Sequence, residues 1–213
     1  MKLNNQESKV YKSFDLEQLG LLPRDWQKQV EDTVLNLAKL VHLDGKSSTS
    51  REPDDTEGCD CYILTGDIIQ KELNWLYRLY TNELVELATA EAKTPMNYSN
   101  DVESSIVINS LRGVDARYEW HVDSNPLTGI LYATTHKKGE GGELVFKTNS
   151  NLIKVIPTAG KFILFDARDI PHCVFPLTVN LRRSSIPMNF YFQDQELIED
   201  RPDDLNNYLF GRK

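Results

Sequence analysis

The second half of the chain carries the hydrophobic pattern of short β-strands, beginning at about residue 103. Apolar and polar residues alternate within short segments, and clusters of glycine, proline, asparagine and aspartate separate those segments as turns. The predicted strands are 104–110, 117–123, 127–134, 143–147, 152–156, 161–166, 172–177 and 183–192. Short strands joined by regular turns predict a β-sandwich or a jelly roll, and we expect the latter, a cupin-like double-stranded β-helix.

The first half is predicted to be mainly helical. Residues 15–43 and 67–92 carry apolar side chains at three- and four-residue steps, the period of an amphipathic helix. A polar loop, 44–58, and a short strand, 59–65, lie between them. The strand contains Cys59-Asp60-Cys61, which we interpret as two reduced thiols in a strand rather than as a metal or redox pair.

These patterns predict a single α+β domain over residues 1–213. We expect an N-terminal helical support region, 1–100, to pack on one sheet of a double-stranded β-helix catalytic core, 101–193. The remaining tail, 194–213, ends in apolar residues that predict a helix docked on the core or on a partner. The length of the 44–58 loop leaves open whether it closes over a site.

Composition narrows the classes of partner. A formal net charge of −8 at pH 7 argues against a broad nucleic-acid-binding surface, which needs an excess of Lys and Arg. No stretch of about 18 apolar residues occurs, so we expect no membrane-spanning helix. The N-terminal residues 1–7 lack the apolar core of a signal peptide, and we therefore expect a cytoplasmic chain. The sequence leaves open whether the chain forms a homodimer.

Two histidines and one aspartate are placed so that they could converge in such a core. His121 and Asp123 share one face of a strand because side chains alternate with a period of two. On their own they could be an ordinary half-exposed pair, but His172 begins another strand, and a jelly roll brings distant strands together. Two imidazoles and a carboxylate form the facial ligand set of a non-haem Fe(II) site with open positions. Arg182, ten residues beyond His172, suits a bidentate grip on a carboxylate.

Five segments between residues 104 and 192 resemble the core of the Fe(II)/2-oxoglutarate-dependent dioxygenases, in the prolyl-hydroxylase-like branch. The matching segments are Tyr118–Asp123, Gly141–Phe146, Ala159–Phe165, His172–Pro176 and Arg182–Ser184. The resemblance implies that His121, Asp123 and His172 are the ligands of Fe(II), and that 2-oxoglutarate and O₂ are co-substrates. It implies no catalytic residue beyond these metal ligands.

The same resemblance implies residues that bind 2-oxoglutarate. Arg182 would bind the distal carboxylate, with Ser184 on the same strand face and Tyr132 as a hydroxyl donor from the strand after the motif. Arg183 is the rival for this role, but it faces away from Arg182 in a regular strand. Asn180 stands where the family often has glycine, two residues before the arginine.

A finer similarity concerns the substrate. The segments Trp120–Pro126, Leu131–His136 and Gly139–Leu144 look like small bacterial enzymes that act on free amino acids, some of them halogenases. Halogenases replace the metal-binding carboxylate with a small residue, whereas Asp123 is present here, so hydroxylation is expected. The predicted reaction is hydroxylation of a small-molecule C–H bond, with release of succinate and CO₂. The alternatives are a prolyl-type protein hydroxylase, a dioxygenase that does not use 2-oxoglutarate, and a non-catalytic jelly-roll binding module.

Two residues are candidates for contacts with the substrate. Glu119 shares strand parity with His121 and could meet a cationic group, although a solvated charge at a strand end is the plainer interpretation. Asn189 faces away from Arg182 in a regular strand, unless Pro187 changes the register. His136 is predicted to be a surface residue of a hairpin.

Overall fold

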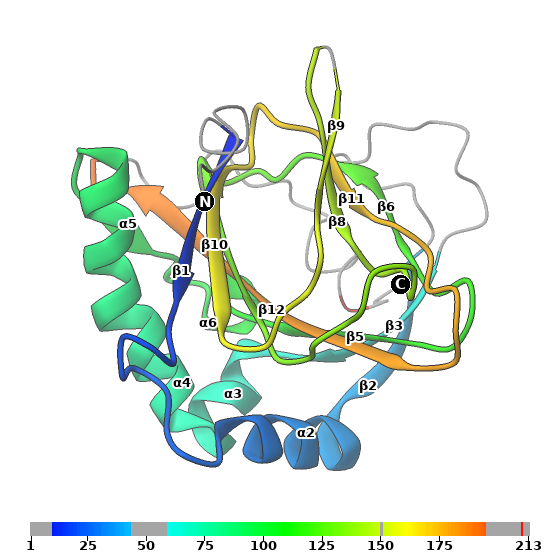
Figure 1. The fold of residues 1–213 in the computed structure, drawn as a ribbon. Helices are drawn as coiled ribbons and strands as arrows, with labels where there is room; N and C mark the ends of the chain where they lie inside the picture. Colours follow the sequence, from blue (N-terminus) through cyan, green and yellow to red (C-terminus); the bar gives the residue numbers. More distant parts are fainter. Residues whose placement is uncertain (1–9, 44–58, 150, 195–209, 211–213) are drawn as a thin grey trace.

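Two antiparallel sheets form the core of the computed structural model, which describes residues 10–43, 59–149, 151–194 and 210 (Figure 1). The major sheet has the strand order β1-β10-β7-β12-β5-β3-β2, with β4 also paired to β12, and the minor sheet has the order β6-β11-β8-β9. The strands are β1 (Tyr11–Asp15), β2 (Lys39–Leu43), β3 (Cys59–Leu64), β4 (Met96–Tyr98), β5 (Ile108–Arg112), β6 (Tyr118–His121), β7 (Leu127–Tyr132), β8 (Leu144–Lys147), β9 (Leu152–Val155), β10 (Lys161–Asp166), β11 (His172–Val174) and β12 (Arg182–Phe192). This is the predicted α+β fold with a double-stranded β-helix core.

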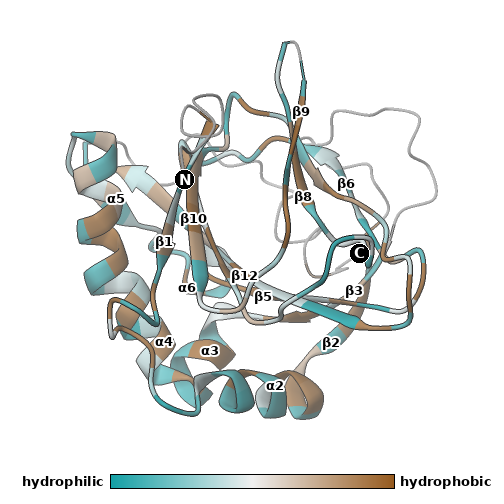
Figure 2. Cartoon of the chain, viewed as in Figure 1, coloured by the Kyte–Doolittle hydropathy of each residue, from teal (hydrophilic) through white to brown (hydrophobic). Residues whose placement is uncertain are grey.

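The helices cover the outer face of the major sheet (Figure 1). They are α2 (Trp26–Leu37), α3 (Gly66–Glu72), α4 (Asn74–Leu79), the π-helical turn η1 (Tyr80–Leu84), α5 (Val85–Ala92) and α6 (Val102–Ser105). Apolar and polar positions alternate along α4 and α5 (Figure 2). The buried positions meet the sheet, for example where the Tyr80 ring lies 5.5 Å from that of Phe190. Helix packing on one sheet, as the sequence predicts, therefore buries a continuous apolar layer.

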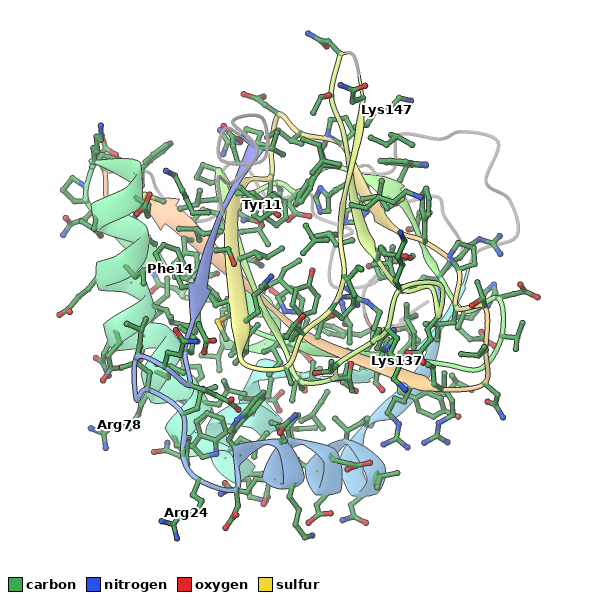
Figure 3. The ribbon with its side chains drawn as sticks, viewed as in Figure 1. Tyr11, Phe14, Arg24, Arg78, Lys137 and Lys147 are labelled. Carbon is green, nitrogen blue, oxygen red and sulfur yellow. The ribbon has the colours of Figure 1, made fainter. Side chains whose placement is uncertain are left out.

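Strand β1 shows how each major-sheet strand divides its side chains between two cores. Tyr11 faces the inner core between the sheets, where it stacks on Phe146 with ring centroids 5.7 Å apart. Phe14 faces the helical layer and packs against Phe162 with ring centroids 6.4 Å apart (Figure 3). Because side chains alternate along a strand, the parity of a residue decides which core it enters.

The predicted helix over residues 15–43 is too long, because the observed helix α2 begins at Trp26 and ends at Leu37. Residues 39–43 form β2, in which Val41 and Leu43 are buried while His42 lies exposed, with Nδ1 2.9 Å from Asp60 Oδ1. Alternating burial in Lys39–Leu43 is a strand pattern, and Ala38 already has an extended backbone. The N-terminal region therefore also contributes strands to the major sheet.

Two further boundaries differ from the predictions. The helical stretch over 67–92 is interrupted at Leu73, whose backbone is not helical (φ −124°, ψ 49°). The strand predicted to start at 104 begins later, because Asp101 caps α6 by accepting a hydrogen bond from the Glu103 backbone N–H.

Parts of the predictions fall on residues outside the description. The 44–58 loop does so entirely. Of the tail beyond residue 194, the structure describes Phe210, which packs against the inner core. No helix in the described ranges is long and apolar enough to cross a membrane.

Candidate active site

The structure brings His121, Asp123 and His172 together between the two sheets. His121 ends β6 and His172 begins β11, and the two are direct partners in the minor sheet. Their Nε2 atoms lie 3.5 Å and 3.7 Å from Asp123 Oδ1. One potential ligand atom from each residue lies within 4.8 Å of those of the others. Residues separated by about fifty positions thus converge, as the fold prediction requires.

Backbone carbonyls orient both imidazoles. His121 Nδ1 lies 2.8 Å from the Glu119 carbonyl oxygen, and His172 Nδ1 lies 3.0 Å from that of Ile170. When each Nδ1–H donates to its carbonyl, each Nε2 keeps its lone pair toward Asp123. Burial lowers the pKa of His172 to about 4, with the neighbouring His121 as a second cause. At neutral pH the His172 ring is therefore in the form that binds metals.

A hydrogen-bond chain fixes the carboxylate of Asp123. The Thr128 hydroxyl donates to Asp123 Oδ2, and Asn125 Nδ2 donates to Thr128 Oγ1 over 2.7 Å. Asn125 is itself held by a second bond of 2.7 Å to the Leu127 carbonyl. Oδ2 is thus occupied, and Oδ1 is left facing the two histidines. Sequence reasoning missed Thr128 and Asn125, because the bond depends on how the turn after Asp123 folds back.

These residues line a pocket between the sheets. Its wall combines apolar side chains with polar groups from both sheets. The apolar members are Val107, Leu111, Ile130, Leu144, Val174 and Pro187, and the polar members beyond the three converging residues include Asn109, Glu119, Thr128, Arg183, Ser185 and Asn189. An apolar enclosure with a few converging polar groups is typical of a small-molecule site.

Arg183 is the cation in this lining. Its side chain is 2% exposed; Nε donates to the Gly142 carbonyl over 2.7 Å and Nη1 to Ser185 Oγ over 2.8 Å. The guanidinium lies 5.5 Å from the ring centroid of Tyr132. The buried Tyr132 hydroxyl has no hydrogen-bond partner in the described part of the chain. Burial raises the pKa of Tyr132, so its hydroxyl stays protonated and can donate.

The structure does not place Arg182 and Ser184 in the pocket lining. Arg182 lies on the outer face of the major sheet, where Nη1 is 3.3 Å from Glu31 Oε1 of α2. Ser184 Oγ is 3.0 Å from Ser110 Oγ on the same outer face. Because β12 alternates, Arg183 and Ser185 enter the pocket in place of Arg182 and Ser184.

The structure places the other predicted residues as follows. Glu119 lines the pocket and is 5% exposed, so it is not a solvated charge at a strand end. Asn189 also lines the pocket, and its Nδ2 donates to the Ser104 carbonyl over 3.1 Å. Tyr132 lies beside Arg183. The prediction that His136 is a surface residue is wrong, because its side chain is buried at 5% exposure.

The donor set fits a divalent iron with an anionic co-substrate. Two imidazoles and one carboxylate, each oriented by a hydrogen bond to a neighbouring group, are the ligand types of a facial Fe(II) site. The unpartnered Tyr132 hydroxyl beside a buried guanidinium fits a carboxylate, which accepts hydrogen bonds from both.

Residues 106–191 match the model of a protein family described as the 2OG-Fe(II) oxygenase superfamily. Over these residues, which form the core of the two sheets, the chain is similar to this superfamily. Its members are oxygenases that use Fe(II), 2-oxoglutarate and O₂, and this matches the residues converging in the pocket. No curated protein matches the sequence.

Solved structures share the fold of this chain. A 2OG-Fe(II) oxygenase family oxidoreductase from Burkholderia pseudomallei superposes with a TM-score of 0.64 at 12% identity, covering 90% of this chain and 93% of that chain. A prolyl hydroxylase from Trichoplax adhaerens, in complex with a hypoxia-inducible factor peptide, gives 0.61 at 15% identity, covering 92% and 90%. The α-ketoglutarate-dependent epimerase SnoN from nogalamycin biosynthesis gives 0.59 at 14% identity, covering 86% and 76%. At these identities the similarity concerns the fold alone.

Proposed function

We propose that this oxygenase hydroxylates a C–H bond of a small molecule, such as a free amino acid, with conversion of 2-oxoglutarate and O₂ to succinate and CO₂. The observation that carries the proposal is the joint presence, in one pocket, of the three converging residues and Arg183. Asp123 keeps the carboxylate in the ligand set, which favours hydroxylation over halogenation.

In this proposal His121 Nε2, His172 Nε2 and Asp123 Oδ1 hold Fe(II), the group that activates O₂ when 2-oxoglutarate is bound. The chain's own contribution is orientation. Carbonyl oxygens hold the Nδ1 side of each ring, and the Thr128 hydroxyl holds the far oxygen of Asp123. All three residues line the pocket, where a co-substrate and a substrate could approach a bound metal ion.

We assign the distal carboxylate of 2-oxoglutarate to Arg183, with the Tyr132 hydroxyl as a second donor. The support is the burial of the guanidinium, its place in the pocket lining and the unpartnered hydroxyl beside it. Ser185 accepts a bond from Nη1 and so holds the guanidinium rather than contacting the ligand itself. A buried cation gains most from an anionic partner, because water does not screen the pair.

Glu119 and Asn189 are the proposed contacts to the substrate. The carboxylate of Glu119 lines the pocket and suits a cationic group such as an α-ammonium. Asn189 uses Nδ2 on the Ser104 carbonyl, which leaves its amide oxygen to accept a hydrogen bond from the substrate. With Arg183 assigned to 2-oxoglutarate, Glu119 and Asn189 remain as hydrogen-bond acceptors for the substrate. They favour a substrate that carries hydrogen-bond donors.

A prolyl-type hydroxylase of peptides is the second candidate. The shared fold with the peptide-bound prolyl hydroxylase from Trichoplax adhaerens favours it, whereas that shared with the epimerase SnoN favours a small molecule. We rank the small molecule first because the pocket is lined by both sheets and its wall offers Glu119 and Asn189 as acceptors for a small donor-bearing substrate.

The test is succinate formation after anaerobic loading with Fe(II) and 2-oxoglutarate, followed by admission of air. A panel of free amino acids and a proline-containing peptide serve as substrates, with Asp123→Ala as the inactive control. Stimulation by one amino acid, lost in Asp123→Ala, would support the proposal. Stimulation by the peptide alone would replace the small-molecule reading with the prolyl-type one. No 2-oxoglutarate turnover and no iron-dependent binding of 2-oxoglutarate would contradict both.

A further inference from the structure

His136 is buried beside the arginine that faces the pocket, and it is absent from the pocket lining. We propose that His136 is a positioning residue for the co-substrate carboxylate, because it fixes the turn whose Gly142 carbonyl holds the guanidinium of Arg183. The inference rests on the proposed function, in which Arg183 binds the distal carboxylate of 2-oxoglutarate.

The imidazole of His136 lies between two backbone carbonyl oxygens; a neutral ring donates its single N–H to one of them, and a protonated ring donates to both. Its Nδ1 lies 3.0 Å from the Gly141 carbonyl oxygen, in the turn before β8. Its Nε2 lies 3.2 Å from the Arg182 carbonyl oxygen, at the start of β12. The backbone N–H of His136 donates to the Pro157 carbonyl over 3.0 Å, which ties the ring's own segment to the β9–β10 connection. The ring thus links the turn to the strand that carries Arg183.

The turn in question supplies the acceptor for Arg183. Gly142 lies directly after Gly141, and its carbonyl accepts the 2.7 Å bond from Arg183 Nε. Gly142 has φ +76°, and a Cβ there would lie 3.0 Å from His136 Nδ1 and 3.1 Å from Arg183 Cδ. The imidazole and the arginine stem therefore pack against the same α-carbon. A shift of this turn would move the acceptor of Nε and with it the guanidinium.

The backbone of β12 at Ser184 is hydrogen-bonded to the residues that follow β7. The Ser184 backbone N–H donates to Thr134 Oγ1 over 3.0 Å, and the Ala133 backbone N–H donates to the Ser184 carbonyl over 3.0 Å. These bonds hold β12 to β7 but do not reach the Gly141–Gly142 turn. His136 contacts both the turn and β12, so its loss should loosen the Nε support and leave the Nη1 bond to Ser185 in place.

Comparing the binding of 2-oxoglutarate with that of oxalate separates the support of Arg183 from a general effect on the site. 2-Oxoglutarate has the distal carboxylate, whereas oxalate can chelate the metal but is too short to reach Arg183. Their dissociation constants would be measured by calorimetry on the full chain loaded with Mn(II) in the absence of O₂. In His136→Gln we expect the constant for 2-oxoglutarate to rise about tenfold and that for oxalate to stay within about twofold.

A second variant distinguishes the two ring contacts. The amide of asparagine can donate near the position of Nδ1 and keep the Gly141 contact, whereas that of glutamine lies nearer to Nε2. His136→Asn should therefore weaken 2-oxoglutarate binding less than His136→Gln. His42→Gln is the matched control, because His42 is exposed and pairs with Asp60. Thermal unfolding of each variant verifies that it is folded at the assay temperature.

The outcomes distinguish the proposed role of His136 from the assignment of Arg183 to the 2-oxoglutarate carboxylate. Unchanged 2-oxoglutarate affinity in folded His136→Gln, or an equal loss for oxalate, would overturn the role of His136. If His136→Gln does not fold, the same comparison on His136→Phe, which has a ring but no N–H donor, decides it: a rise for 2-oxoglutarate alone supports the role, and no rise overturns it. If Arg183→Met leaves the affinity for 2-oxoglutarate unchanged, the assignment of Arg183 fails instead, whatever the His136 variants do.

Discussion

Arg182 and Arg183 are adjacent in β12, but their guanidinium groups lie on opposite faces of the major sheet. Arg182 Nη1 lies 3.3 Å from Glu31 Oε1 of α2, outside the barrel. Arg183 Nε lies 2.7 Å from the Gly142 carbonyl oxygen, inside it. The two side chains have the same chemistry and differ in their surroundings, so each is the natural control for the other.

The hydroxyl of Thr128 should contribute to metal affinity through Asp123. In Thr128→Val the Asp123 carboxylate loses the bond to Oδ2 and can turn away from the histidines. We expect the affinity for Fe(II) to fall about 10- to 100-fold, the range typical of lost second contacts to ligands. Anaerobic metal titration measures this, with Thr33→Val in α2 as the control. Equal affinity in Thr128→Val and the wild type would contradict the orienting role.

The hydroxyl of Tyr132 should contribute to 2-oxoglutarate binding but not to the free energy of unfolding. It is buried and has no hydrogen-bond partner among the described residues, so Tyr132→Phe removes an unsatisfied polar group. We expect the free energy of unfolding to stay within about 1 kcal/mol of the wild type or to rise. The dissociation constant of 2-oxoglutarate should increase several-fold. A variant that is clearly less stable but binds 2-oxoglutarate normally would show that the hydroxyl is structural.

The thiol of Cys61 should be unreactive in the folded protein. Cys61 is fully buried, and burial raises the pKa of its thiol to about 12. Since the thiolate is the nucleophile, alkylation at pH 8 should leave Cys61 unmodified. Peptide mapping after iodoacetamide treatment tests this, with the same reaction in denaturant as the reference. Modification of Cys61 at the rate seen in denaturant would mean that this part of the inner core opens readily.

Periodicity predicts the strands of this fold well where one period holds over a whole segment. The stretches predicted at 127–134, 143–147 and 161–166 correspond to β7, β8 and β10. It fails at Lys39–Leu43, because that segment directly follows α2 and its apolar residues also fit helical spacing. Only pairing with β3 distinguishes the two readings, and pairing between segments is not visible in the sequence.

The convergence of His121, Asp123 and His172 was predictable because local parity places His121 with Asp123, and the fold brings in His172. The arginine was not, because both faces of β12 are covered and parity alone does not say which is the barrel interior. A signal was nevertheless present. Ile186, Met188 and Phe190 mark the helix-covered face, so Arg182 lies on that face and Arg183 on the other. Parity with Asn189, which lines the pocket, gives the same answer.

The most direct test of the site is the affinity for 2-oxoglutarate in Arg183→Met and Arg182→Met, each loaded with Mn(II) without O₂. We expect the dissociation constant to rise at least about tenfold in Arg183→Met, since a charge-assisted contact to the carboxylate is lost. In Arg182→Met it should stay within about twofold, because Arg182 lies on the other face of the major sheet, outside the pocket lining. A large loss in Arg182→Met with no change in Arg183→Met would contradict the account.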